Sequence, residues 1–466
     1  MEQARPRPKP RPSTIAVVAI LLLLLILPLL ATACGDDSNN AATTEPSTTE
    51  GPNTTEPQTS GDEIQLAMSD TARLTPAASQ ADTLSAAASL QAFGVDLYRL
   101  LATDAGDGNL VFSPSSIVTA LAMTYAGAAG STAEEMATVL HFALEGDALH
   151  QALNSLDTAL ESRSFQQKNP DGKEEGVLIK TANSLWGQKD TVFEQIFLDT
   201  LAANYGAGIR LVDYQTEAEE ARQAINAWVA DETNEKITDL IPEGALDALT
   251  RLVLVNAIYL DATWRSQFDP QLTFDGSFTT LGGDSVTTPM MNQQTRFPYA
   301  SGDGWQAVDL PYVGEQVAMT LIVPGEGRFD EVEDRLVGGL IDEVVGSLGE
   351  GPEVDLTMPK FEFRTQAGLN EALTTLGMGA AFDPEVADFS GMTKQESLFI
   401  SDVIHEAYIA VDEEGTEAAA ATAVIMELTA MPQVVELYID RPFLFALRDL
   451  ETGALLFLGR VADPSV

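Results

Sequence analysis

The segment at residues 411–431 restricts what this chain can fold into more than any other. It opens with acidic residues and Gly415, continues through a run of alanines, and ends in apolar residues before Pro432. Alanine favours a helix, whereas the threonine and β-branched residues that follow the run favour a strand. Local propensity therefore leaves open an alanine-rich helix end, a mobile loop or an extended strand.

As a strand, this segment would separate its charges from its apolar surface, because the side chains of a strand alternate between two faces. One face would carry Thr416, Ala418, Ala420, Thr422, Val424, Met426 and Leu428, and the other would carry Glu417, Ala419, Ala421, Ala423, Ile425 and Glu427. Both glutamates fall on the second face, so the first face could be buried completely. The small residues near the start could also slide between strands that already pair.

The first half of this segment resembles the hinge of the reactive-centre loop of serpins, a family of protease inhibitors. The residues that match are Glu413, Glu414, Gly415, Thr416, Glu417, Ala418, Ala419, Ala420, Ala421 and Thr422. Other stretches resemble serpin strands and helix starts in the family's order: Phe112-Ser113-Pro114, Asn256-Ala257-Ile258-Tyr259, Asp440-Arg441-Pro442-Phe443 and Leu456-Phe457-Leu458-Gly459. The resemblance extends from about residue 83 to the C-terminus.

The resemblance implies an α+β serpin fold with a large central sheet A, smaller sheets B and C, about eight or nine helices and an exposed reactive loop. The residue patterns agree with this fold. Apolar residues recur at helical spacing from Leu84 to Leu101. Residues 252–260 are apolar except for Asn256, which is typical of a strand buried on both faces.

Two capping boxes predict where further helices begin. They are Thr132 with Glu135 and Thr216 with Glu219. In such a box the hydroxyl and the carboxylate each accept a backbone N–H that the first helical turn leaves unpaired.

The N-terminal region is expected to export and tether the protein. Residues 1–33 combine a basic start, an apolar run and small residues, as in a bacterial lipoprotein signal peptide, and Cys34 would then be acylated. An uncleaved anchor helix is the alternative, because the apolar run is near the minimum length for spanning a bilayer. Residues 34–82 are rich in Thr, Ser, Glu and Pro and predict a disordered tether, and residues 83–466 would form the serpin domain. Either way the domain would be extracytoplasmic, membrane-anchored or secreted.

Composition excludes several classes of function. The formal net charge of −45 argues against binding to nucleic acids or anionic membranes through surface charge. No basic cluster in the body of the chain favours activation by a heparin-like polyanion. A single cysteine also rules out an internal disulfide.

No catalytic or cofactor-binding motif stands out. The histidines are His141, His150 and His405, and none belongs to a His-Glu-x-x-His pair. A Gly-x-Ser-x-Gly elbow and a glycine-rich phosphate loop are absent from the sequence as well. We therefore expect no enzymatic activity, no metal and no cofactor.

The resemblance assigns roles to polar residues that would otherwise be interpreted as ordinary core positions. Ser113, Ser116, Asn256 and His405 match the serpin shutter, a buried polar network beneath the two strands that must part. Trp264 matches the breach, where the loop first enters the sheet, although an ordinary core tryptophan is the alternative. Glu406 stands where the family usually has lysine, which leaves a local ion pair in doubt.

Through the resemblance, the function would be inhibition of serine proteases, and possibly cysteine proteases, by a suicide-substrate mechanism. The protease attacks the loop and forms an acyl-enzyme, and the hinge then inserts into the central sheet as a new strand. The hinge here has no proline and no bulky or charged residue on its buried face, which favours inhibition. A non-inhibitory surface module for binding or adhesion is the alternative.

The cleaved bond is expected near the end of the opening segment. The family's spacing from the hinge glycine, counted from Gly415, gives Thr429–Ala430. Bonds involving Leu428 or Met431 are alternatives, and cleavage before Pro432 is disfavoured. Thr, Ala or Leu at this position indicates an elastase- or subtilisin-like protease as the partner, with the inhibitor acting as a monomer.

Overall fold

The computed structural model describes residues 64–169, 172–349, 351–416 and 434–466, which all belong to one unit, Asp62–Val466. Several predictions of the sequence concern residues outside these ranges. They are the signal peptide, Cys34, most of the tether, hinge residues 417–422, and the candidate cleavage positions Leu428, Thr429, Ala430 and Met431. The start of the hinge, up to Thr416, is described.

Nine α-helices lie within the described residues, together with two 3₁₀ turns. The helices are α1 Gln80–Ala105, α2 Pro114–Tyr125, α3 Gly130–Val139, α4 Gly146–Glu161, α5 Gln195–Tyr205, α6 Tyr214–Glu232, α7 Phe329–Asp334, α8 Leu340–Ser347 and α9 Asn370–Leu376, and the turns are η1 Pro270–Leu272 and η2 Gly379–Phe382.

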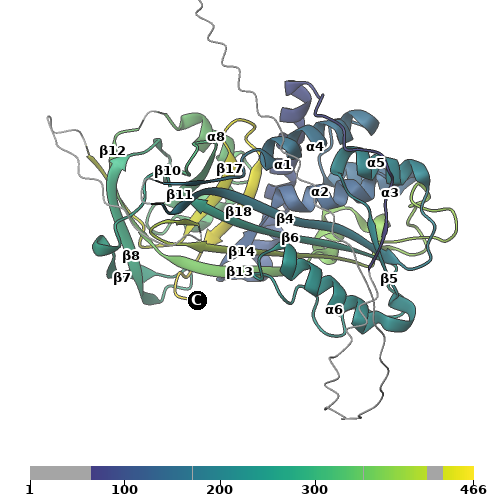
Figure 1. Ribbon diagram of the computed structural model, residues 1–466. Coiled ribbons are helices and arrows are strands. Elements are labelled where there is room, and N and C mark those ends of the chain that lie inside the picture. The colour runs from purple at the N-terminus through teal and green to yellow at the C-terminus, as the bar shows by residue number, and fades with distance from the viewer. Residues whose placement is uncertain (1–63, 170–171, 350, 417–433) are drawn as a thin grey trace, which may run out of the picture. The chain divides into compact units, whose positions relative to one another are not determined.

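The strands of the described residues form three mixed or antiparallel sheets (Figure 1). The central sheet A contains β1 Gln65–Ala67, β3 Phe165–Lys168, β4 Glu174–Gln188, β5 Ile209–Val212, β6 Leu252–Thr263, β13 Phe361–Gly368, β14 Asp402–Val411 and β15 Gly415–Thr416. Sheet B contains β2 Leu110–Phe112, β9 Tyr299–Gly302, β10 Trp305–Pro311, β11 Val317–Pro324, β17 Phe443–Asp449 and β18 Leu455–Val461. Sheet C contains β7 Phe274–Thr279, β8 Ser285–Arg296, β12 Glu353–Pro359 and β16 Val434–Tyr438.

Strand β6 lies in the middle of sheet A and is covered on both faces, as its apolar sequence predicts. Leu252 and Leu254 belong to the main core, which includes α2, whereas Val253 and Val255 pack in a second cluster with α6. Figure 1 shows α6 on the opposite side of the central sheet from α1–α5. The predicted helix over Leu84–Leu101 is confirmed as part of α1.

Both predicted capping boxes are wrong, for different reasons. At α3 the two residues bind partners from distant parts of the chain. Helix α3 begins after Ala129, and no side chain caps it. The Thr132 hydroxyl instead accepts the N–H of Asp388, and the Glu135 carboxylate accepts the N–H of Ala380. Local sequence cannot show that a tertiary partner competes for these side chains.

At α6 the cap is one turn earlier than predicted. Asp213 is the N-cap residue, and its carboxylate accepts the N–H of Thr216 at 3.1 Å. Glu219 lies further along the helix and forms an ion pair with Arg222 at 2.8 Å. Glu217 has non-helical dihedral angles, so the first turn is kinked at this point.

Residues upstream of α1 also contact the body of the domain. Strand β1 pairs antiparallel with β5 at the edge of sheet A. Arg73 then forms ion pairs with Asp157 at 2.6 Å and with Glu161 at 2.7 Å, both on α4. Among the described residues, no helix is long and apolar enough to cross a membrane.

Candidate functional site

The described start of the predicted hinge is a tight turn that leads the chain from β14 back into the same sheet. The Asp412 carboxylate accepts the N–H groups of Glu414 at 2.9 Å and Gly415 at 3.3 Å. The Asp412 N–H in turn donates to the Gly415 carbonyl at 3.0 Å. Aspartate is suited to such a turn because its short side chain reaches backbone groups two and three residues ahead.

The hinge has already entered sheet A by two residues. Strand β15 lies between β6 and β14, where Thr416 pairs with Val411 on one side and with Ala262 on the other. Further along the sheet β6 and β14 pair directly with each other, from Asp402 opposite Val253 to Ala407 opposite Ile258. The gap between these two strands is therefore open at one end and closed below it.

Gly415 does not serve a left-handed backbone conformation, because its φ is not among the positive values. A Cβ at Gly415 would instead lie 2.0 Å from the carbonyl oxygen of Ala262 on β6. The glycine is therefore needed for the close approach of two backbones.

Trp264, the predicted breach residue, contacts the hinge directly. Its ring stacks on Tyr312, with centroids 4.5 Å apart and planes inclined by 11°. Its indole N–H donates to the Asp412 carbonyl at 3.0 Å, and its backbone N–H donates to the Glu414 carbonyl at 2.8 Å. The Tyr312 hydroxyl is 2.6 Å from that of Thr416, so the stacked pair forms a buried floor beneath the entering strand.

Each glutamate of the hinge turn is held by a lysine from another part of the chain. Glu413 forms an ion pair with Lys360 at 2.6 Å and also accepts the hydroxyl proton of Thr273 at 2.7 Å. Burial by itself would raise the pKa of Glu413, but these two hydrogen bonds outweigh it and lower the pKa. Glu414 pairs with Lys173, which precedes β4, at 2.8 Å.

The predicted shutter residues meet at the closed part of the gap, on the face of sheet A that α2 covers. His405 on β14 lies opposite Asn256 on β6, and its Nδ1 bonds to the Asn256 amide oxygen. The Nε2 of His405 accepts the backbone N–H of Ser113 at 3.1 Å. His405 and Asn256 are fully buried, so the network ties the two strands to each other and to the start of α2.

Two further residues complete this network, and the sequence did not indicate them. The Asn256 amide group donates to Ser116 at 2.6 Å and to the Asn183 side chain on β4 at 2.5 Å. Ser116 donates to Asn183 at 2.7 Å, and Ser115 lies 3.2 Å from Ser113. Two polar residues, Asn183 and Ser184, lie between Ala182 and Leu185 in the more buried second half of β4, and the sequence alone does not show which of them faces Asn256.

The geometry fixes the protonation state of His405. Its Nδ1 faces a carbonyl oxygen and must donate, whereas its Nε2 faces an N–H and must accept, so the ring is neutral. Burial lowers the pKa of His405 to about 3, although the bond to Asn256 acts in the opposite direction.

Glu406, which departs from the family pattern, lies on the opposite face from His405. It is 3.5 Å from Arg364 of β13, so an ion pair does form at this position with a partner on the neighbouring strand. Burial raises the pKa of Glu406, and Arg364 only partly offsets this.

The site therefore combines a point where β15 enters sheet A, a buried aromatic floor beneath it, and a polar network that joins β6 to β14. Among the described residues, no group of three or more His, Cys, Asp or Glu side chains could hold a metal ion. What the arrangement can do is admit a strand, provided that β6 and β14 separate below β15.

Comparison with known proteins is consistent with this geometry. The family model for serpins, serine protease inhibitors, matches residues 88–464. An uncharacterized serpin-like protein of Thermococcus kodakarensis is 40% identical over 378 residues, which cover 80% of this chain and 85% of the relative. The human leukocyte elastase inhibitor is 35% identical over 387 residues, covering 80% of this chain and 97% of that protein. The solved structure of Serpin48, a highly specific serpin of the insect Tenebrio molitor, matches with a TM-score of 0.71 and 27% identity, covering 81% of this chain and 98% of that one.

Proposed function

The chain belongs to the serpin family of protease inhibitors, and from this we propose that it acts as a suicide substrate whose cleaved loop inserts into sheet A. As a member of this family it is a protease inhibitor and not an enzyme. The observation that carries the proposal is the position of β15. Two residues of the hinge already pair between β6 and β14, so insertion needs only to extend a strand that has begun.

The energy available for insertion supports this mechanism. About a dozen new ladder hydrogen bonds at roughly 1 kcal/mol each would contribute on the order of 10 kcal/mol. That is comparable to the stability of a whole domain, before the burial of apolar side chains is counted. The intact form must then be kinetically trapped, and cleavage of the loop releases it.

Alanine-sized residues at the front of the hinge favour rapid entry, and rapid entry is what separates an inhibitor from a substrate. If the strand inserts before water hydrolyses the acyl-enzyme, the protease stays covalently bound and is carried away from the loop's original position. If insertion is slower than hydrolysis, the protease is released and the inhibitor is wasted.

The proposed targets are serine proteases of elastase or subtilisin type, cleaving at Thr429–Ala430 or a neighbouring bond. No arginine or lysine lies between residues 411 and 431, which disfavours trypsin-like proteases. The leukocyte elastase inhibitor among the relatives carries an elastase in its name, which is consistent with this class.

We propose in addition that the inhibitor is held at the cell surface by a lipid on Cys34, through the tether that the sequence predicts after it. The order of basic, apolar and small residues before Cys34 supports this location. The corresponding test is expression of Cys34→Ser in a bacterial host. The wild-type protein should incorporate labelled palmitate and this variant should not, while both keep their inhibitory activity.

The mechanism is tested by incubating the protein with pancreatic elastase or with subtilisin. We expect a protease–inhibitor complex that survives SDS, and a loop-cleaved form that melts well above the intact protein. Thr416→Arg is the matched control, because Thr416 is 1% exposed beside Tyr312 and a charged arginine cannot be buried there. This variant should still be cleaved but should form no complex.

Cleavage of the wild-type loop with no complex and no gain in melting temperature would rule out strand insertion. In that case a non-inhibitory binding role would remain for this serpin. Mass spectrometry of the fragments identifies the cleaved bond in either case.

A further inference from the structure

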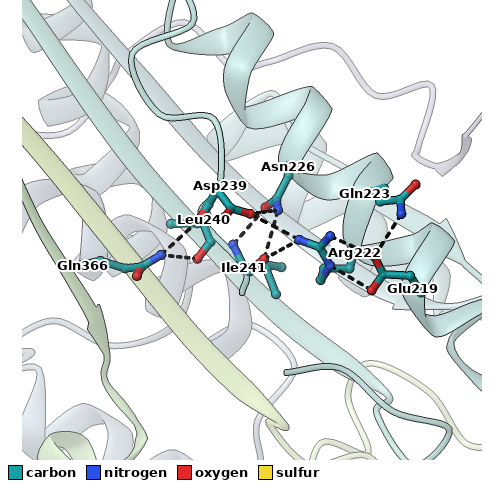
Figure 2. A network of polar contacts seen from close by, with 8 residues as sticks. All are labelled: Glu219, Arg222, Gln223, Asn226, Asp239, Leu240, Ile241 and Gln366. Carbon is teal, nitrogen blue, oxygen red and sulfur yellow. Dashed lines mark hydrogen bonds and ion pairs between the residues drawn. The ribbon is translucent and has the colours of Figure 1, made fainter. Parts of the chain in front are cut away.

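The gap that must open between β6 and β14 is bridged on both faces of sheet A. The face covered by α2, which carries the network of His405, is called the back, and the face covered by α6 is called the front. Side chains alternate along β14, so His405 points to the back network while Glu406, the next residue, belongs to the front. On the front, residues 233–241 follow α6 and cross over the sheet. Figure 2 shows this segment between α6 on one side and β13 on the other.

The α6 end of this crossing segment is firmly attached. Arg222 donates to the Ile241 carbonyl at 2.8 Å and to the Asp239 carboxylate at 3.2 Å. Asn226 donates to the same two groups at 2.9 and 3.0 Å, and its amide oxygen accepts the Ile241 N–H at 2.8 Å. Asn226 is buried and Arg222 is charged, so these bonds are shielded from water or charge-assisted.

At the β13 end, the hydrogen bonds that the described residues show come from one neutral side chain. Gln366 donates to the Leu240 carbonyl at 2.7 Å and to the Asp239 carbonyl at 3.1 Å. In the sheet Gln366 lies opposite Glu406 of β14, and Glu406 lies opposite Ala257 of β6. The two bonds therefore connect β13 to a segment whose other end is attached on the far side of the gap.

Apolar contacts and one cation–π contact hold the middle of the segment over the gap. Leu240 and Ile241 are fully buried in a cluster with Val255 of β6 and Ile404 of β14. The Lys236 ammonium lies 5.5 Å from the centre of the Tyr408 ring on β14. The crossing segment thus contacts the strands on both sides of the closed part of the gap.

Insertion of a strand must stretch this bridge. A new strand between β6 and β14 separates them by one further strand spacing, about 4.8 Å, and β13 moves with β14 because the two pair along their whole length. A hydrogen bond does not survive a displacement of that size. Either the bonds of Gln366 or those of Arg222 and Asn226 must therefore break.

We propose, building on the inhibitory mechanism above, that Gln366 is the releasing end of this bridge and that its two hydrogen bonds help to set the rate of loop insertion. The α6 end has more bonds, a charged donor and a buried amide, so the segment stays with α6. Gln366 is a positioning residue in this role, because it neither contacts the protease nor forms part of the inserted strand.

If Gln366 had a purely structural role, its loss would destabilise the intact and the loop-cleaved proteins alike. If its bonds instead break during insertion, only the intact protein should be affected, and this contrast provides the test. The variants are Gln366→Ala, Arg222→Ala and, as a matched control, Gln223→Ala, since among the described residues the side chain of Gln223 bonds to Glu219 of the same helix at 2.9 Å. Each variant is measured for three properties: conversion of the intact protein to an inserted form on mild heating, moles of inhibitor consumed per mole of elastase, and the melting temperature of the cleaved form.

We expect Gln366→Ala to convert about three- to tenfold faster than wild type, because two neutral hydrogen bonds, one exposed and one partly buried, are lost only from the intact state. Its consumption per elastase should not rise, and its cleaved form should melt like cleaved wild type. Arg222→Ala should lower the melting temperature of both forms, and Gln223→Ala should match wild type throughout.

Equal conversion rates for Gln366→Ala and Gln223→Ala would overturn the proposal, as would an equal loss of melting temperature in the intact and cleaved forms of Gln366→Ala. These outcomes are separate from failure of the inhibitory mechanism. That failure would appear in the wild-type protein, as cleavage with neither an SDS-stable complex nor a more stable cleaved form.

Discussion

His405 shows how a single buried side chain can hold two strands together while leaving them able to separate. Its imidazole donates to Asn256 and accepts from Ser113, so it joins β14 to β6 and to α2 with one polar group. A buried network of this kind is costly if a partner is lost and stable while every partner is present. Apolar side chains between β6 and β14 would not favour one arrangement of the two strands in this way.

The neutral state of His405 predicts acid sensitivity of the intact protein. In the unfolded chain a histidine binds a proton near pH 6.5, whereas in the folded protein the pKa of His405 is about 3. The unfolded state therefore takes up more protons as the pH falls from 6.5 toward 3. The contribution of neutral His405 to the free energy of unfolding is therefore complete above pH 6.5. Below pH 6.5 the free energy of unfolding falls by about 1.4 kcal/mol per pH unit.

This prediction is checked by urea unfolding of wild type and His405→Asn between pH 5 and pH 7.5. His150, whose pKa burial lowers to about 4, adds a similar dependence to both proteins and cancels in the comparison. The difference in unfolding free energy between wild type and His405→Asn should become smaller as the pH falls. Parallel curves for the two proteins would contradict the assignment, and an NMR titration of the imidazole tests it directly.

Which distant residues lie together was predictable where the resemblance supplied it and not elsewhere. Ser113, Ser116, Asn256 and His405 were named from motifs, and the structure brings all four together. Asn183 was missed because one sequence does not show which polar residues of different strands face each other. Lys360 and Lys173 were missed for the same reason, since their partners Glu413 and Glu414 lie far away in the sequence.

At the scale of elements, the two-residue strand β15 is the feature that couples the loop to the sheet. It can lie there because Gly415 lets its backbone approach Ala262 and because the floor of Trp264 and Tyr312 accepts Thr416. Strand alternation in the sequence predicted that this segment could join a sheet. It did not predict that Thr416 already pairs in the intact protein.

Replacing Gly415 with alanine should expel this short strand from the sheet. The new Cβ would lie 2.0 Å from the Ala262 carbonyl oxygen, and neither backbone can move without breaking the ladder. We expect a loss of roughly 1–3 kcal/mol in unfolding free energy. Amides of residues 412–416 should exchange hydrogen faster, and more inhibitor should be consumed per protease because entry is no longer prepared.

The control for this change is Gly368→Ala on β13, where an added Cβ meets no atom within 4 Å. Gly368→Ala should leave exchange at residues 412–416 and the consumption of inhibitor unchanged. If Gly415→Ala behaves like Gly368→Ala, the close approach to Ala262 does not govern the hinge.

Element boundaries were predicted unevenly, and the reason is physical. The buried strand over residues 252–260 and the helix over Leu84–Leu101 were recognisable because many residues carry each signal, a continuous apolar run for the strand and helical spacing for the helix. The capping boxes depended on two residues each, and in α3 both side chains bind distant backbone groups instead. A signal carried by few residues is easily overridden by tertiary contacts.

At the scale of the whole molecule, the dominant electrostatic feature is a large negative net charge. The chain has 70 acidic and 25 basic residues, a formal net charge of −45. Its basic residues are largely engaged in ion pairs in the described part of the chain, for example Arg163 with Asp449 at 2.6 Å and Arg460 with Glu333 at 2.8 Å. The excess of carboxylates therefore produces a negative electrostatic potential around the protein.

This field predicts that association with a cationic protease slows as salt is added. Opposite net charges raise the rate of encounter by long-range attraction, and salt screens that attraction within about 10 Å at 0.1 M. Between 0.02 and 0.5 M NaCl, we expect the second-order inhibition rate for a cationic protease to fall about tenfold or more. For an anionic protease that cleaves the same bond, the rate should rise or stay constant. Stopped-flow measurements with both enzymes distinguish steering from a general salt effect on loop insertion, because insertion follows acylation and would change both rates in the same direction.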